Sequence, residues 1–401
     1  MKSRFCITPL GDIFDVTSSK RVLKKQWRDS GVPFYRAREI VKLAEHGSVE
    51  NSLFIDEDHY SELEGNFGVP KAGDMMVSAV GTLGACYIVQ PHDRFYFKDA
   101  SVLRFAPKIK VDCHFIKYSF KNNFVANQIH SSAGTTVATF TISRARRTQI
   151  PLPPLEDQRR IVEILDAAQA LIDQRKEQLG LMDQLVQSLF YEMFGDPVTN
   201  PMGWEIAELG SIVSDTKLGL VRSSKEFGWD FRVPYVRMDS ISKDGRFLSQ
   251  NVQMTEADAE EISLYELFPG DLLFNTRNSK ELVGKVCIYR GSRGAVFNNN
   301  IMRMRFLAGI EPRMVAAQFQ TQFIQHELEK RKKGTTSVFA IYWKTLRTLP
   351  LMNPNAELQT QFAERVEAIE GQKAAMAASL VELETTFQAL MQRAFKGELT
   401  G

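Results

Sequence analysis

The sequence predicts an α+β protein: two globular domains with twisted sheets, separated by two long heptad helices packed as an antiparallel coiled coil. Two observations support this fold class. The chain repeats itself at an offset of about 200 residues, and each half ends in a long apolar seam with a seven-residue period. Two similar halves joined through their helices imply a pseudo-twofold internal repeat. A chain of 401 residues is also too long for one ordinary core.

The internal repeat is clearest at residues 31–40 and 232–241, which are GVPFYRAREI and RVPYVRMDSI. Val32, Pro33 and Arg36 recur 201 positions later. Further echoes follow in the same order, with offsets between 197 and 205: LGDI and LGSI, SSK and SSK, AGDMMV and PGDLLF, AGTT and KGTT, IPL and LPL. A collinear series of this kind indicates duplication of a whole structural unit.

Each half closes with a predicted long helix. Apolar residues recur along both at alternating steps of four and three, broken only by Arg175 and Lys373. A strict 3.5-residue period keeps one stripe facing a partner helix, and about 37 residues make a rod of about 55 Å. The predicted seam comprises Ile161, Leu165, Ile172, Leu179, Met182, Val186 and Leu189, followed in the second helix by Phe362, Val366, Ile369, Leu380, Leu383, Phe387 and Leu390.

The residues before each helix have the pattern of a sheet. Short apolar runs such as GDMMVSAV and DLLFNT lie between Gly, Asp and Asn, which is typical of strands joined by loops. We therefore expect α+β domains with long loops. The predicted order is a globular domain at residues 1–150, a helical region at 151–198, a globular domain at 199–349 and a helical region at 350–401.

Composition favours a soluble cytoplasmic protein. Hydrophobic residues make up 44% of the chain and charged residues 24%. No run of about 18 apolar residues is present, so no membrane partner is expected, and the N-terminal segment lacks the apolar core of a secretory signal. The four cysteines are scattered without a Cys-x-x-Cys pair, which predicts reduced thiols rather than a zinc site or disulfides.

Catalytic signatures are absent from the sequence. It contains no phosphate-binding P-loop, no Asn-Pro-Pro-aromatic tetrapeptide and no Gly-x-Ser-x-Gly elbow. Its six histidines show no metal-ligand spacing. We therefore expect neither catalysis nor a bound cofactor in this chain.

Positive charge is clustered although the formal net charge is only +2. Residues 20–28 carry five positive charges, residues 101–150 contain eight Lys or Arg against one acid, and KRKK occupies residues 330–333. Such clusters suit a polyanion. For any single cluster, the alternative is an ordinary solvated face.

Side chains suited to nucleic acid lie in the predicted loops. Gly-Thr-Thr offers N–H groups and hydroxyls to phosphate, and arginine or asparagine beside a turn can recognise guanine or adenine edges. The alternatives are surface ion pairs for the arginines and turn chemistry for asparagines 298–300. The candidate DNA-binding residues are Lys20, Arg21, Lys24, Lys25, Arg36, Arg38, Thr135, Thr136, Lys225, Arg237, Asn275, Arg277, Asn278, Lys280, Lys332, Lys333, Thr335, Thr336, Tyr342 and Lys344.

Several segments resemble one known family. IPLPPLEDQRRIVEILDAAQALIDQRKEQLGLMDQLVQSLFYEMFGD resembles the central conserved region of the DNA-specificity subunits of type I restriction–modification systems. LPLMNPNAELQTQFAERVEAIEGQ resembles their distal conserved region, and VPYVRMDSI, GDLLF and GTT resemble the framework of their target-recognition domains. The resemblance covers essentially the whole chain.

The resemblance implies a non-catalytic subunit whose two target-recognition domains each bind one half of a split, asymmetric site in double-stranded DNA. It also implies two modification subunits, which methylate adenine N6 with S-adenosylmethionine, and restriction subunits, which translocate and cut DNA with ATP and Mg²⁺. The helices would set the separation of the half-sites. Arg36 and Arg237 would position the DNA backbone, whereas Arg38, replaced by Asp239 in the second half, would differ between targets.

Two other functions remain open from the sequence. One is a two-lobed coiled-coil scaffold that assembles protein partners without touching DNA. The other is a self-contained nuclease or methyltransferase with unrecognised motifs. The loops SAVGTLG and NTRNSKELVG differ between otherwise similar halves, which favours two different DNA targets.

Overall fold

The structure is a computed structural model, and the part of the chain that it describes comprises residues 4–131, 138–228, 230–334 and 336–399. Three of the candidate DNA-binding residues, Thr135, Thr136 and Thr335, lie outside these described residues.

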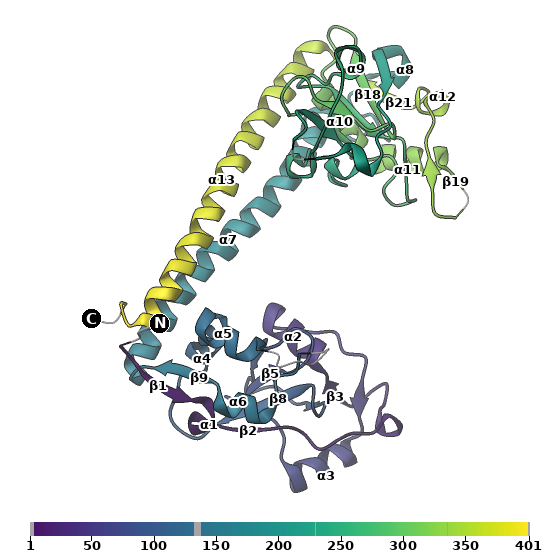
Figure 1. The fold of residues 1–401 in the computed structure, drawn as a ribbon. Helices are drawn as coiled ribbons and strands as arrows, with labels where there is room; N and C mark the ends of the chain where they lie inside the picture. Colours follow the sequence, from purple (N-terminus) through teal and green to yellow (C-terminus); the bar gives the residue numbers. More distant parts are fainter. Residues whose placement is uncertain (1–3, 132–137, 229, 335, 400–401) are drawn as a thin grey trace. The chain divides into compact units, whose positions relative to one another are not determined.

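The chain divides into two compact units. Unit 1 consists of Met1–Arg175 with Ser379–Gly401, and unit 2 of Lys176–Ala378. Two long helices, α7 (Leu155–Phe194) and α13 (Ala356–Lys396), each contribute one part to each unit (Figure 1). The predicted fold class, mixed α+β domains with two long helices, is confirmed.

The globular part of unit 1 is built on a four-stranded antiparallel sheet of order β2-β8-β5-β6. A three-stranded sheet of order β4-β3-β7 and a two-stranded ribbon, β1-β9, complete it. All four residues of β5 are buried, which explains its continuous apolar run. The elements are β1 (Cys6–Pro9), α1 (Leu10–Ile13), β2 (Phe14–Thr17), η1 (Lys24–Gln26), β3 (Val32–Tyr35), α2 (Ala37–His46), β4 (Phe54–Ile55), α3 (Glu57–Phe67), β5 (Met75–Ser78), β6 (Cys86–Ile88), β7 (Tyr96–Phe97), β8 (Val102–Pro107), α4 (Cys113–Lys121), α5 (Asn123–His130), α6 (Ile142–Arg147) and β9 (Gln149–Leu152).

Unit 2 repeats these three sheets as β11-β18-β14-β16, β13-β12-β17 and β10-β21, and adds a small sheet of order β15-β20-β19. Its elements are β10 (Glu205–Glu208), α8 (Leu209–Ile212), β11 (Val213–Leu218), η2 (Ser224–Glu226), β12 (Val233–Val236), η3 (Met238–Ser240), η4 (Ser249–Asn251), β13 (Gln253–Thr255), α9 (Ala259–Tyr265), β14 (Leu272–Asn275), β15 (Arg277–Asn278), β16 (Val286–Ile288), β17 (Val296–Phe297), β18 (Ile301–Phe306), α10 (Pro312–Phe319), α11 (Gln322–Arg331), β19 (Lys333–Gly334), β20 (Phe339–Ala340), α12 (Trp343–Leu346) and β21 (Pro350–Asn353).

Each unit contains an equivalent ion pair that holds its four-stranded sheet together. Asp74, in the turn before β5, pairs with Arg104 on β8 at 2.6 Å. Asp271 pairs with Arg305 on β18 at 2.7 Å. Both aspartates are buried, and a buried carboxylate needs such a partner. The repeated AGD and PGD sequences therefore mark a repeated structural contact.

The long helices are antiparallel within each unit. In unit 1, Ile161 and Leu165 of α7 share a core cluster with Phe387 and Ala394 of α13. Thus the beginning of α7 packs against the end of α13, as a continuous apolar stripe on each helix permits. Buried seam residues in this unit are Ile161, Leu165, Ile172 and Phe387, with Leu380, Leu383 and Leu390 partly buried against the same cluster.

In unit 2, the end of α7 packs against the beginning of α13. Phe362 lies between two aromatic rings of α7, with centroids 6.1 Å from Phe190 and 5.3 Å from Phe194. Seam residues Leu189, Phe362 and Val366 are buried, Val186 and Ile369 are partly buried in the same cluster, and Leu179 and Met182 are half-buried.

One buried glutamine anchors the start of each long helix. Gln158 accepts a hydrogen bond from the backbone N–H of Asp112 (2.9 Å), and Gln359 accepts one from that of Glu311 (2.9 Å). Each also donates to the carbonyl of the proline five residues earlier. Buried polar side chains are usually hydrogen-bonded in this way. The hydrogen bonds of the two glutamines attach each helix to the globular part of its unit.

The cysteines are free thiols, with Cys86 and Cys287 fully buried. Burial raises the pKa of both to about 12, so they are unreactive structural residues. None of the helices in the described part of the chain combines the length and apolar character needed to span a bilayer.

Candidate nucleic-acid interface

The turn after β3 in unit 1 is built around a buried carboxylate. Glu39 is 2% exposed, accepts the backbone N–H of Arg36, and pairs with the guanidinium groups of Arg36 (3.0 Å) and Arg38 (2.5 Å). Burial opposes ionisation of Glu39, but the hydrogen bonds from the two arginines outweigh it and hold its pKa below the ordinary value. Both predicted DNA-binding arginines of this turn are therefore tied to one side chain.

The equivalent turn after β12 in unit 2 has a neutral cap. Ser240 Oγ accepts the backbone N–H of Arg237 at 3.3 Å, in place of a carboxylate. The Arg237 side chain is 41% exposed, and its ion-pair partner is Asp239 at 3.6 Å. Ser240 carries no charge, so Arg237 has no capping carboxylate to pair with, whereas Arg36 in unit 1 pairs with Glu39.

The loop after the central β-strand differs between the units in length and chemistry. In unit 1, the backbone N–H of Gly84 at the end of the loop donates to the carbonyl of Ser78 (2.9 Å). In unit 2, the backbone N–H of Gly284 donates in the same way to the carbonyl of Asn275 (2.9 Å). The loops contain residues 79–83 and 276–283, so the second is three residues longer. Both glycines have positive φ, which any residue with a Cβ adopts only with strain.

Asn275 differs from the sequence-based expectation, because it is fully buried at the base of this loop. Its amide donates to the carbonyls of Arg277 and Asn300 and accepts from Asn278 (3.0 Å). The Asn275 amide thus holds the loop and does not face solvent. Arg277 is exposed on β15 and makes no side-chain hydrogen bond or ion pair within the described residues.

Two further candidates of unit 2, Lys280 and Lys332, meet at one carboxylate. Lys332 and Lys280 pair with Glu329 at 2.7 and 3.5 Å, and Lys332 also donates to the carbonyl of Lys280 (2.7 Å). The hydrogen bond from Lys332 is the main cause of the lowered pKa of Glu329. These contacts attach the long loop to the end of α11. Lys333, on β19, is exposed next to them.

The remaining candidates of unit 2 are exposed. Tyr342 is 52% exposed at the N-cap of α12 and makes no capping hydrogen bond. Lys344 follows it on α12, Thr336 lies before β20, and Lys225 lies in η2; all three are exposed. An exposed tyrosine two residues before an exposed lysine provides a stacking surface with a positive charge nearby.

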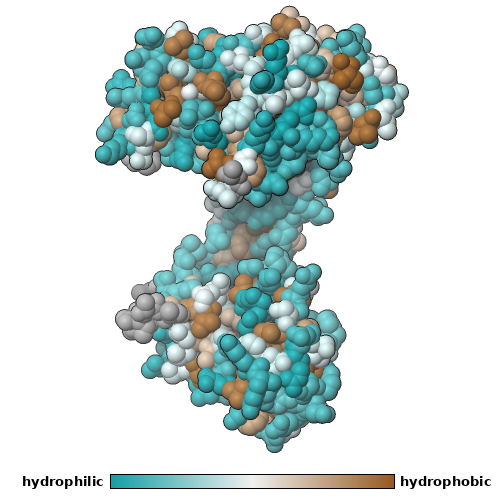
Figure 2. Space-filling model, turned by 90° about the vertical axis from the view of Figure 1, so that its right-hand side faces the viewer, coloured by the Kyte–Doolittle hydropathy of each residue, from teal (hydrophilic) through white to brown (hydrophobic). Residues whose placement is uncertain are grey.

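The basic cluster of unit 1 lies around η1. Lys20 is anchored through its backbone N–H, which donates to the hydroxyl of Tyr96 (3.0 Å). Arg21 pairs with Asp99 at 2.8 Å although its side chain is 71% exposed. Lys24 and Lys25 form the exposed turn of η1. The hydrophilic colour predominates on the faces seen in Figure 2, with apolar side chains scattered between.

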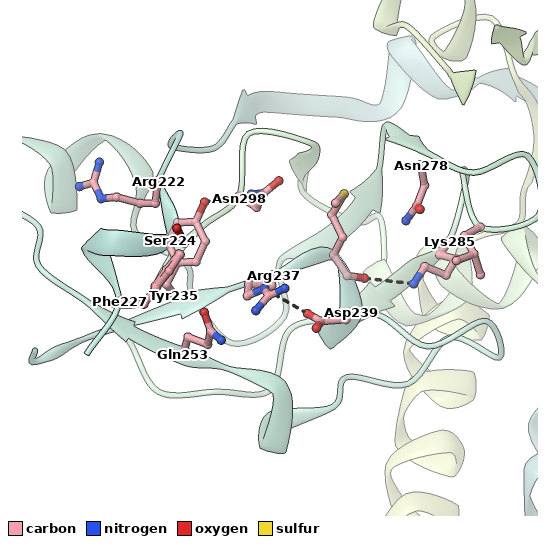
Figure 3. Close-up of a pocket in the computed structure, with 12 residues that line it drawn as sticks. Arg222, Ser224, Phe227, Tyr235, Arg237, Asp239, Gln253, Asn278, Lys285 and Asn298 are labelled. Atoms are coloured by element: carbon pink, nitrogen blue, oxygen red, sulfur yellow. Dashed lines mark hydrogen bonds and ion pairs between the residues drawn. The ribbon is translucent and has the colours of Figure 1, made fainter. Parts of the chain in front are cut away.

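Unit 2 contains a polar cleft of about 550 Å³ that the sequence does not reveal. Figure 3 shows this cleft between η2, the turn that joins β12 to η3, and the loop of residues 276–283. Arg237 and Asn278 are the two candidates that it brings together; Arg277, Lys280, Tyr342 and Lys344 lie elsewhere. Its other polar lining residues are Arg222, Ser224, Tyr235, Asp239, Gln253, Lys285 and Asn298, of which only Asn298 is singled out by the sequence as a possible base contact, as part of the asparagine triplet.

The cleft has a cationic rim and an amide-rich wall. Arg222 is held by Glu261 at 2.5 Å, and Lys285 donates to the backbone carbonyls of Met238 and Ile241. Burial lowers the pKa of Lys285. No group of three or more metal-binding side chains occurs in the described ranges. The cations that line the cleft are thus engaged by carboxylates or carbonyls of the protein itself.

Comparisons with known proteins agree with this architecture. A profile of the type I restriction modification DNA specificity domain matches residues 4–180. The chain is similar to the EcoKI specificity subunit of Escherichia coli (strain K12), with 24% identity over 309 residues, 71% of this chain and 65% of that protein. It is also similar to the StySPI specificity subunit of Salmonella potsdam, with 24% identity over 322 residues, 73% of this chain and 67% of that protein.

The fold has a solved counterpart. A chain from a structural study of complex assembly and conformational transition in the type I R-M system superimposes with a TM-score of 0.62, at 18% identity and 98% coverage of both chains. The match to the EcoKI subunit spans just under two thirds of that protein. The profile match, the two relatives and the duplicated fold make the chain similar to the DNA specificity subunits of type I restriction–modification systems.

Proposed function

We propose that this chain recognises an asymmetric, bipartite site in double-stranded DNA, with one half-site bound by each unit. The observation that carries the proposal is that one framework occurs twice with different surface chemistry. The strand orders and the Asp–Arg pairs are repeated, whereas the turns after β3 and β12 and the loops after β5 and β14 differ. A repeated framework suits the repeated geometry of the duplex, and the variable side chains select base pairs.

In this proposal the chain is a non-catalytic cytoplasmic subunit. Two modification subunits transfer the methyl group of S-adenosylmethionine to adenine N6, and restriction subunits use ATP and Mg²⁺ to translocate and cut DNA. These cofactors therefore bind on partner subunits. The names of the EcoKI and StySPI proteins, specificity subunits of type I restriction enzymes, support assembly with such partners.

The proposal is tested by mapping adenine methylation in genomic DNA from cells that contain this chain and its modification subunits. We expect one asymmetric sequence made of two half-sites with a fixed spacer. In parallel, DNA binding by the complex should weaken linearly with log salt concentration, because cations of the protein release counterions from phosphate. Binding without salt dependence, together with no methylated consensus, would favour a protein scaffold instead.

A further inference from the structure

The small three-stranded sheets of the two units can be matched residue by residue from their pairing. Phe34 on β3 and Tyr235 on β12 occupy the same position on the central strand, because each faces the first residue of its parallel partner strand. On the other side, the N–H of Phe34 donates to the carbonyl of Leu53 (2.9 Å), and Tyr235 lies opposite Gln253. Gln253 therefore takes, in unit 2, the place of Leu53 in unit 1.

Most polar groups around the unit 2 cleft are already hydrogen-bonded within the protein. Arg222 pairs with Glu261, and Lys285 donates to two backbone carbonyls. Asn298 donates to the hydroxyl of Tyr235 (3.0 Å), which in turn donates to a backbone carbonyl. Groups with filled hydrogen-bonding capacity give the cleft a fixed shape but are poor donors to a ligand.

Gln253 is an exception among these lining residues. It is half-buried, its side chain lines the cleft (Figure 3), and its amide makes no hydrogen bond with any other described residue. Solvent reaches the Gln253 amide, so its donor and acceptor are open to a group from outside the protein, at a strand position where unit 1 carries leucine. The position and the chemistry of Gln253 therefore indicate contact with a ligand.

The charges around the cleft indicate which part of DNA it contacts. The carboxylate of Asp239 lines the cleft beside the guanidinium of Arg237, 3.6 Å away. A carboxylate repels phosphate oxygens but accepts hydrogen bonds from exocyclic amino groups of bases. The site is thus better suited to base edges than to the sugar–phosphate backbone.

We propose that Gln253 is a specificity-determining residue of unit 2, and that its amide recognises adenine through N6 and N7 in the major groove of one half-site. A glutamine amide presents one donor and one acceptor in the spacing that these two atoms require. Arg237 contacts the neighbouring base pair from the same cleft. The inference rests on the proposed recognition of DNA, and it names the side chain and the base.

The test uses randomised double-stranded DNA, presented to the complex of the full chain with its modification subunits, and sequences the methylated molecules. Gln253→Leu installs the residue of the matching unit 1 position. It should reduce the preference for adenine at one base pair roughly 5- to 100-fold and leave the other half-site unchanged. Gln253→Glu should move the preference at that base pair to cytosine, whose N4 amino group donates to a carboxylate.

Gln250→Leu is the matched control, because it makes the same change on an exposed residue outside the cleft lining; it should keep the wild-type consensus. A thermal unfolding curve of each variant separates loss of recognition from loss of fold. An unchanged consensus in both Gln253 variants would overturn the assignment, as would equal loss at both half-sites. If the wild-type complex selects no sequence, the proposed function fails together with the assignment.

Discussion

The segments that follow β3 in unit 1 and β12 in unit 2 each begin with an arginine at the N-cap of a helix, but the two arginines have different partners. In unit 1, the turn is capped by Glu39, a buried carboxylate that binds Arg36 and Arg38. In unit 2, Ser240 makes the cap without charge, and Arg237 lies at the cleft. The capping residue therefore separates an arginine tied to a buried carboxylate from one that lines an open cleft.

The largest expected effect concerns the framework that the units share. Asp74→Ala and Asp271→Ala each leave a partly buried arginine without its carboxylate partner. Each should lower the free energy of unfolding by about 3 kcal/mol, measured by urea denaturation. Asp271 accepts two hydrogen bonds from Arg305, whereas Asp74 accepts one from Arg104, so the cost of Asp271→Ala should be equal or larger.

An exposed ion pair serves as the control for these variants. The Arg94–Glu57 pair is more than half exposed on both sides, so Glu57→Gln should leave the urea midpoint unchanged. A large cost for Asp74→Ala with none for Asp271→Ala would show that the framework is not energetically duplicated.

The next largest effect separates the two arginines of the turns. Arg237→Ala should reduce discrimination at one base pair of one half-site roughly 10- to 100-fold, because a bidentate guanidinium contact with guanine is lost. Arg36→Ala should lower stability instead, since it removes one of two cations from buried Glu39. Methylation maps of both variants check this, and equal relaxation of the two half-sites would contradict the comparison.

The sequence predicts the repeat and the long helices because both depend on local or periodic signals. The 3.5-residue period of the seam is visible without knowledge of the partner helix. It does not predict the role of each polar side chain, because that depends on contacts far apart in the chain. The Asn275 amide is buried against the carbonyl of Asn300, and Gln253 is placed at the cleft only by its pairing with Tyr235.

A smaller effect is expected from the charge of the unit 1 cap. The pKa of Glu39 is lowered by folding, so its stabilisation is complete above the ordinary carboxyl pKa of 4.5 and is lost as pH falls through the lower folded value. Glu39→Gln should therefore cost about 1–2 kcal/mol near neutral pH and progressively less in acid. Urea unfolding over this pH range measures the difference.

The matched change in unit 2 is Ser240→Ala, which removes an uncharged cap. Its cost should not vary with pH, because neither side chain titrates. If the stability difference between Glu39→Gln and the wild type were independent of pH, the buried carboxylate would not be the source of the effect.

The smallest effect concerns the caps of two matching short helices. Thr141 caps α6 in unit 1 by accepting the N–H of Arg144, whereas Tyr342 stands at the same position of α12 and makes no such bond. Tyr342→Thr should stabilise unit 2 by about 0.5 kcal/mol by supplying the missing acceptor. It should also weaken DNA binding, because an exposed aromatic ring is lost. A variant that gains stability and keeps full DNA affinity would show that the tyrosine is not retained for contact with DNA.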